Sequence, residues 1–499
     1  MVESIFFYLY NKLKNKKFTL ICTFFILKIS FLEAQVFDKI IFDSLQKLEA
    51  RITPKGLQEA HPFQSFITLR PVSEKDSVPL ELAEYQYDNG ARVFLMNTPY
   101  EKNKIHLKAI SWGGYSLYES EEDRKLVYTS PNVIESLGVG DLSRDELIFL
   151  MARDTSYKYF LSKMEQVGTF RISELDEQMN IVFRGNQFET AIKVVYNYFT
   201  NLKIKNKIAF NEEEARYHIK DWEMRKADSI VLLLNDEHLI TTNCKFPDFR
   251  NSEKFVRAHQ LFKERFADGG DFTFVFVGDF SKAQNMVGIF NKYIGNLPKD
   301  DKGEFCKFLP TSLKKIPDLD YSNQVFCGPS NYLHYEDSTQ YDVENVINAL
   351  YMSELYDYNL KKIFPENIHS IVYSVKHGVI HYPLTKLCFD ITFMNNPHLD
   401  KKSLYQSMEG SITALQVKRL NPDEIGVFNA FFLKKIDQST ATNDYYIDYL
   451  TQHIMEGLEL DKLFKRGELE EYLKTFTPEK IQTLAKRYWN VERRTKIVK

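Results

Sequence analysis

The chain has 499 residues, of which 44% are hydrophobic and 14% aromatic, and this is enough apolar material for two or three domain cores. The charges nearly balance, with 65 Lys and Arg against 68 Asp and Glu. A nucleic-acid-binding protein usually has a strong basic excess, so we expect no nucleic-acid partner. The aromatic content also argues against long disordered segments.

The N-terminus has the order of a secretory signal: basic, then apolar, then small. Four lysines lie between Lys12 and Lys17, an apolar run covers residues 18–27, and Ala34 offers a small residue for cleavage. The apolar run is shorter than the roughly 20 residues that cross a bilayer. We expect residues 1–34 to be a signal peptide and the protein to be exported to the periplasm or envelope. An uncleaved membrane anchor or a buried helix is the alternative.

Residues 35–79 are a mixed lead-in, and a first domain is predicted for residues 80–297. Its opening is a hairpin, because two alternating segments flank Asp88-Asn-Gly90, a strong turn signal. Strands are predicted at residues 82–87, 91–96, 104–111, 169–173, 178–183 and 272–277.

Helix-start signals separate these strands. Ser120 precedes three acidic residues and predicts an N-cap. Ser143-Arg-Asp-Glu146 has the pattern of a capping box. Pro131 predicts an interruption of the helix that follows Ser120. The further predicted helices cover residues 188–199, 211–227, 253–266 and 281–294.

Three prolines among Lys and Asp predict a linker at residues 298–319, followed by a second domain at residues 320–499. In the second domain strands are predicted at residues 323–326, 331–335, 370–375 and 384–393. A helix is predicted at residues 342–362, helices fill most of the remainder, and Thr477-Pro-Glu479 starts the last one. Hairpin strands followed by runs of helices predict an α+β fold with largely antiparallel sheets.

One segment is more specific than the others. In residues 265–280 an Asp-Gly-Gly turn joins the end of a helix to a buried strand that stops at Gly278-Asp279. This segment resembles a signature of the insulinase (pitrilysin-type) zinc peptidase family. Four further segments of the chain are similar to segments of that family: residues 87–95, 112–118, 137–141 and 476–488. The likeness covers about residues 80–499 and is closest to the non-catalytic C-terminal half. It implies two tandem homologous α/β units, as in a metallopeptidase half or mitochondrial processing peptidase.

The family binds zinc through His-x-x-Glu-His on a helix, where i, i+4 spacing puts both imidazoles on one face. The resemblance places this helix near residues 125–137, which contain no histidine. We interpret Glu135, in that segment, as a helix-surface acid. The only histidines four apart are His377 and His381, and no glutamate lies between them. In a strand they would be roughly 13 Å apart, too far to share one zinc ion. A turn at Gly378 would shorten that distance.

We therefore expect no catalytic residue, no metal ligand and no cofactor in this chain, and zinc only in a partner half. In active family members the second half supplies a basic residue and a tyrosine that hold the substrate backbone. The resemblance assigns these roles to Lys361 or Lys362 and to Tyr373. A lysine cannot make the bidentate contacts of the usual arginine, and Tyr373 could instead be a core tyrosine.

The resemblance thus implies an exported, catalytically inactive peptidase half. Such a half would bind a peptide substrate, or pair in proteolysis with a zinc-bearing half encoded separately. Two alternatives remain at this point. One is an active metallohydrolase with an atypical site near His377 and His381. The other is a non-enzymatic scaffold or binding protein of the envelope.

Overall fold

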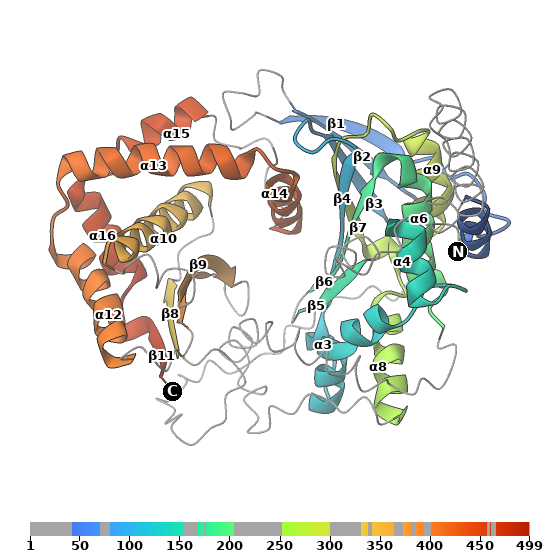
Figure 1. Cartoon of the computed structure of the whole chain (residues 1–499), viewed down its shortest axis with the longest axis horizontal. Coiled ribbons are helices and arrows are strands. Elements are labelled where there is room, and N and C mark those ends of the chain that lie inside the picture. The colour runs from blue at the N-terminus through green and yellow to red at the C-terminus, as the bar shows by residue number, and fades with distance from the viewer. Residues whose placement is uncertain are drawn as a thin grey trace, which may run out of the picture.

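The computed structural model describes residues 42–69, 80–152, 168–173, 176–203, 252–299, 331–337, 342–363, 373–380, 386–393, 401–456, 460 and 466–498. In this part of the chain two units lie side by side, each built from a sheet and covering helices (Figure 1). The predicted α+β fold is therefore confirmed. The signal segment, the helix at residues 211–227, the strand at 323–326 and most of the linker lie outside the described residues.

The first unit is built on a seven-stranded sheet with the order β1-β2-β3-β7-β4-β6-β5. Its neighbours pair antiparallel except β3 and β7, which are parallel. Residues 63–69, within the expected lead-in, form β1 and extend the sheet beyond β2. The strands are β1 (Phe63–Leu69), β2 (Leu80–Gln86), β3 (Arg92–Asn97), β4 (Lys104–Trp112), β5 (Thr169–Ile172), β6 (Asp176–Arg184) and β7 (Thr273–Gly278).

Helices cover one face of this sheet. Alternate residues of β4, Ile105, Leu107 and Ala109, point into the core beneath them, as the period of two in a strand requires. In Figure 1 α4, α6 and α9 lie on the opposite side of the sheet from α14. The helices of the unit are residues 42–52, α3 (Glu121–Ser136), α4 (Arg144–Ala152), α6 (Phe188–Thr200), α8 (Ser252–Arg265) and α9 (Met286–Tyr293).

The predicted helix start at Ser120 is confirmed, but the predicted interruption of that helix at Pro131 is wrong. The Ser120 hydroxyl accepts a hydrogen bond from the Asp123 backbone N–H, and α3 continues through Pro131 to Ser136. Pro131 has no N–H for the Val127 carbonyl one turn earlier. The Ser130 hydroxyl donates to that carbonyl over 2.7 Å instead, so the helix keeps a partner for it.

The second unit has a four-stranded sheet with the order β11-β8-β10-β9, antiparallel throughout. Helices cover most of residues 401–488, as we expected, and residues 494–498 then form a strand, β11, that pairs with β8. The strands are β8 (Asn331–Asp337), β9 (Tyr373–Ile380), β10 (Lys386–Phe393) and β11 (Arg494–Val498). The helices are α10 (Val343–Ile363), α12 (Lys401–Val417), α13 (Pro422–Thr440), α14 (Asn443–Glu456), α15 (Arg466–Leu473) and α16 (Pro478–Tyr488).

Two turns touch at the centre of the first unit. They are the hairpin turn at residues 88–90 and the Asp-Gly-Gly turn at residues 268–270. Gly90 has a φ of 100°, a conformation that favours glycine. A Cβ on Gly270 would lie 2.1 Å from the Asn89 carbonyl oxygen. The Asn89 side-chain amide donates to the Ile294 and Leu297 carbonyls over 3.0 and 3.1 Å. These contacts bring the start of β7 beside the start of β3.

This close approach predicts the effect of a single methyl group. The substitution Gly270→Ala should lower the free energy of unfolding by about 1–3 kcal/mol, because the turn backbones must separate. The matched control is Gly410→Ala in α12, where an added Cβ meets no atom within 4 Å. There alanine should raise stability by about 0.5–1 kcal/mol. Urea unfolding of both variants measures the difference, and equal midpoints would contradict the prediction.

Helix α8 carries a histidine on its buried face. His259 shares this face with Phe255, Ala258 and Phe262, all buried. Burial, with a smaller contribution from Lys263, lowers the pKa of His259 to about 4. An unfolded chain would have a histidine pKa of about 6.5.

An acid-sensitive stability follows from this difference. Between pH about 6.5 and about 4 the unfolded chain binds a proton that the folded chain does not. The free energy of unfolding should therefore fall as the pH falls, by up to ~1.4 kcal/mol per pH unit. Thermal unfolding of His259→Leu across this range should show a shallower dependence. His61→Leu, at an exposed position, is the control and should keep the full slope.

Candidate functional site

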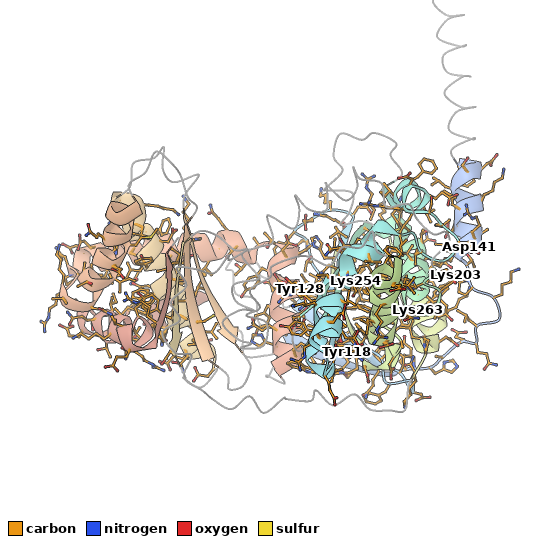
Figure 2. All side chains as sticks on the ribbon, turned by 90° about the horizontal axis from the view of Figure 1, so that it is seen from below. Tyr118, Tyr128, Asp141, Lys203, Lys254 and Lys263 are labelled. Atoms are coloured by element: carbon orange, nitrogen blue, oxygen red, sulfur yellow. The ribbon has the colours of Figure 1, made fainter. Side chains whose placement is uncertain are left out.

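The segment that the resemblance assigns to the metal helix lies in α3, which packs against α8. Figure 2 labels Tyr128 on α3 and Lys254 and Lys263 on α8. Two ion pairs join the helices at the surface. Arg257 of α8 makes a two-pronged contact with Asp123 over 3.0 and 2.7 Å, and Lys254 lies 3.4 Å from Glu122. The polar side chains at this surface are therefore engaged in holding α3 to α8.

A buried ion pair lies beneath this surface, where β4 ends. Glu177 and Arg265 have side chains only 1% and 4% exposed, and their charged atoms are 3.2 Å apart. The same Glu177 oxygen accepts a hydrogen bond of 2.7 Å from the Gly114 backbone N–H. A buried charge is tolerated when it is paired and hydrogen-bonded in this way. The pair fixes the glycine-bearing end of β4 to the end of α8.

Tyr118 lies between this pair and the surface. The Arg265 guanidinium is 5.7 Å from the centre of the Tyr118 ring, and the Tyr118 hydroxyl donates to Glu264 over 3.2 Å. Burial raises the pKa of Tyr118. The hydroxyl is therefore a neutral hydrogen-bond donor at physiological pH, and it cannot act as a phenolate nucleophile.

The interpretation of Glu135 as a helix-surface acid is wrong. Glu135 is only 8% exposed, and its Oε1 accepts a hydrogen bond of 2.9 Å from the Phe170 backbone N–H. Phe170 lies in β5, at the edge of the sheet, where a strand leaves N–H groups without a ladder partner. The carboxylate of α3 closes this edge, and the sequence contains no signal for a contact between residues so far apart.

The described ranges contain no group of three or more His, Cys, Asp or Glu side chains placed to hold a metal ion. His377 lies in β9 opposite Phe389, and Gly378 pairs with Cys388 in the same ladder. Gly378 is therefore part of a strand, so no turn at that residue shortens the distance toward His381. His381 itself lies outside the described residues.

The predicted peptide-binding residues lie on two neighbouring elements of the second unit. Lys361 and Lys362 are in the last turn of α10, and Tyr373 begins β9 opposite Phe393. Helix α10 packs against β9, and β9 is an edge strand of the described sheet. The structure describes the backbone of Tyr373 but not its side chain. Its role in peptide binding therefore stays a prediction.

Both lysines already have contacts. Lys361 Nζ lies 2.6 Å from an Asp357 carboxylate oxygen. Lys362 Nζ lies 4.2 Å from the centre of the Tyr358 ring, a cation–π contact. Tyr358 in turn packs against Phe431, which is partly exposed. We had not predicted this aromatic and basic surface. The i, i+4 spacing of Tyr358 and Lys362 is the one signal that would have indicated it.

Comparison with known proteins relates the sequence and the fold of the chain to peptidases. No protein-family model matches the chain. The probable zinc protease PqqL of Escherichia coli K12 is 21% identical over 233 residues, which are 46% of this chain and 24% of PqqL. The crystal structure of that periplasmic protease superposes with a TM-score of 0.57 and 16% identity, covering 90% of this chain and 47% of PqqL. The chain therefore spans about half the length of PqqL.

Two shorter structures match over nearly their whole length. A protease from Helicobacter pylori has a TM-score of 0.57 and 11% identity, covering 83% of this chain and 98% of that protein. The first half of E. coli PqqL has a TM-score of 0.56 and 13% identity, covering 86% of this chain and 92% of that half. The expected likeness to the C-terminal half stays a prediction, because a first half also shares the fold. In sequence and in fold, the chain resembles the insulinase-type zinc peptidases.

Proposed function

We propose that this chain is a catalytically inactive insulinase-type peptidase half that binds peptide and pairs with a zinc-bearing half in proteolysis. The proposal rests on helix α3, where the inward-facing carboxylate of Glu135 accepts a hydrogen bond from the Phe170 backbone N–H. Residues 125–137 contain no histidine, and the 499 residues contain no His-x-x-Glu-His. Nitrogen ligands and a free glutamate are what a catalytic zinc site of this type requires.

We also propose that the protein is exported. PqqL is described as a periplasmic protease. The order of basic, apolar and small residues before residue 35 supports a similar location for this protein. In the described ranges, none of the helices combines the length and the apolar character needed to cross a bilayer.

The second unit offers the surface for the peptide. An extended peptide can add to the edge of a sheet through main-chain hydrogen bonds, which makes its binding tolerant of sequence. We assign this role to β9, because it is an edge strand of its sheet and packs against α10. The ammonium groups of Lys361 and Lys362 would then attract carbonyl oxygens or carboxylates of the peptide as point charges. In the first unit, the backbone N–H of Phe170 on the edge strand β5 already donates a hydrogen bond to Glu135.

A peptidase assay tests the inactivity and the pairing together. We expect the purified full chain to cleave no peptide in a quenched fluorescent library, with or without added zinc. We expect a complex captured from the native host to cleave the library and to lose this activity with a chelator. Mass spectrometry of that complex should identify a chain carrying His-x-x-Glu-His. Chelator-sensitive cleavage by the purified chain alone would overturn the proposal.

A binding assay tests the peptide surface separately. The double substitution of Lys361→Ala and Lys362→Ala should weaken the binding of labelled peptides by about fivefold to tenfold, because two charge-assisted contacts are lost. Fluorescence anisotropy with the full chain measures this change. Lys434→Ala, at an exposed position of α13, is the matched control and should bind peptide as the original chain does. Equal affinities for all three proteins would exclude this surface.

A further inference from the structure

One helical arm connects the two units. It consists of α13 and α14, residues 422–456, and we call it the α13–α14 arm. Helix α13 packs on α10 of the second unit and runs toward the first unit, where α14 lies against the open face of the seven-stranded sheet (Figure 1). The bend between the helices is buried at Thr440 and Asn443. The arm thus begins in one unit and ends on the other.

Apolar side chains form the centre of this contact. The sheet contributes residues of β1, β2, β3 and β7 that point away from its helix-covered face. With α14 they form a separate core: Leu69, Leu80, Leu82, Phe94, Met96, Val275, Val277, Tyr446, Ile447 and Leu450. Without α14 this strip would be an exposed apolar patch, which monomeric soluble proteins rarely leave open.

Polar contacts surround the apolar centre. The Thr98 hydroxyl donates to the Asn443 side-chain oxygen over 2.5 Å, and both residues are buried. The Tyr100 and Tyr446 rings stack with their centres 5.6 Å apart. This end of α14, where the helix begins, is therefore held by groups that salt does not screen.

One ion pair, Lys108–Asp448, and one histidine–carboxylate contact, His106–Asp444, lie along the length of α14. His106 Nδ1 lies 2.9 Å from Asp444, and Lys108 Nζ lies 2.9 Å from Asp448. The ring of His106 also has Glu101 of its own unit 2.7 Å from Nε2. The two acids are four residues apart in a helix, a rise of about 6 Å, and the two bases are two apart in a strand, a rise of about 6.6 Å. The charges therefore match in register when α14 runs along β4.

We propose that the α13–α14 arm is a salt-sensitive strap, held in register by the pairs His106–Asp444 and Lys108–Asp448, which covers the apolar strip of the first unit and fixes the angle between the units. The carboxylates of Asp444 and Asp448 are 79% and 71% exposed. The basic partners are less exposed, His106 at 6% and Lys108 at 15%, but the solvent around the two carboxylates lets salt screen each pair. Release of the strap uncovers the strip and frees the two units to move. This inference does not depend on the proposed function.

Charge reversal tests the strap. In Lys108→Glu the new carboxylate faces Asp448, so we expect hydrogen exchange in α14 and in the facing parts of β4 and β7 to become about threefold to tenfold faster. Adding Asp448→Lys restores an opposite pair and should return exchange to the original rate. Molar salt should speed exchange of α14 in the original chain and narrow its difference from Lys108→Glu. Mass spectrometry of the full chain reads each segment separately.

The matched control is Lys254→Glu, which reverses another ion-paired lysine of the first unit, 3.4 Å from Glu122. It should leave exchange in α14 unchanged, and its own folding shows that one reversal is tolerated. A hydrophobic dye should bind Lys108→Glu more than the control, because the strip is uncovered. Unchanged exchange of α14 in Lys108→Glu, or no recovery in the double variant, would overturn the proposal.

Discussion

The backbone contact between the turns at residues 88–90 and 268–270 sets the centre of the seven-stranded sheet. A Cβ on Gly270 would lie 2.1 Å from the Asn89 carbonyl oxygen. The backbones of the two turns can therefore approach this closely only because residue 270 has no side chain. The contact starts β7 beside β3 in parallel register. All six residues of β7 are buried. Phe274 and Phe276 face the helices, whereas Val275 and Val277 face α14. The short strand β7 therefore contributes side chains to two hydrophobic cores, one on each face of the sheet.

The region where the resemblance places the metal helix is occupied by structural contacts. Glu135 of α3 bonds the edge of β5, and Glu177 bonds Gly114 and Arg265. Each carboxylate is buried and accepts hydrogen bonds there, and a buried polar group that lacks such bonds is costly. Peptide binding is accordingly proposed for the second unit. There, β9 is an edge strand of the described sheet, and Lys361 and Lys362 at the end of α10 are exposed.

Local patterns predicted much of the fold, and the errors have different causes. The hairpin at residues 88–90 and the caps at Ser120, Ser143 and Thr477 involve groups within a few residues of one another. The interruption at Pro131 was wrong because a neighbouring hydroxyl satisfies the open carbonyl. Glu135 was misread because its partner is 35 residues away. Lys361 and Lys362 were proposed from the resemblance alone, and no local pattern separates a binding lysine from a solvated one.

The sequence by itself determined the α+β class, most strands and helices, and the resemblance to insulinase-type peptidases, because these depend on periodicity, caps and short motifs. Only the tertiary structure decided that β3 and β7 run parallel, that β11 closes the second sheet, and that α14 crosses to the first unit. The Thr98–Asn443 bond joins residues 345 apart. Such contacts form only when the whole chain buries its apolar surface, and no local signal encodes them.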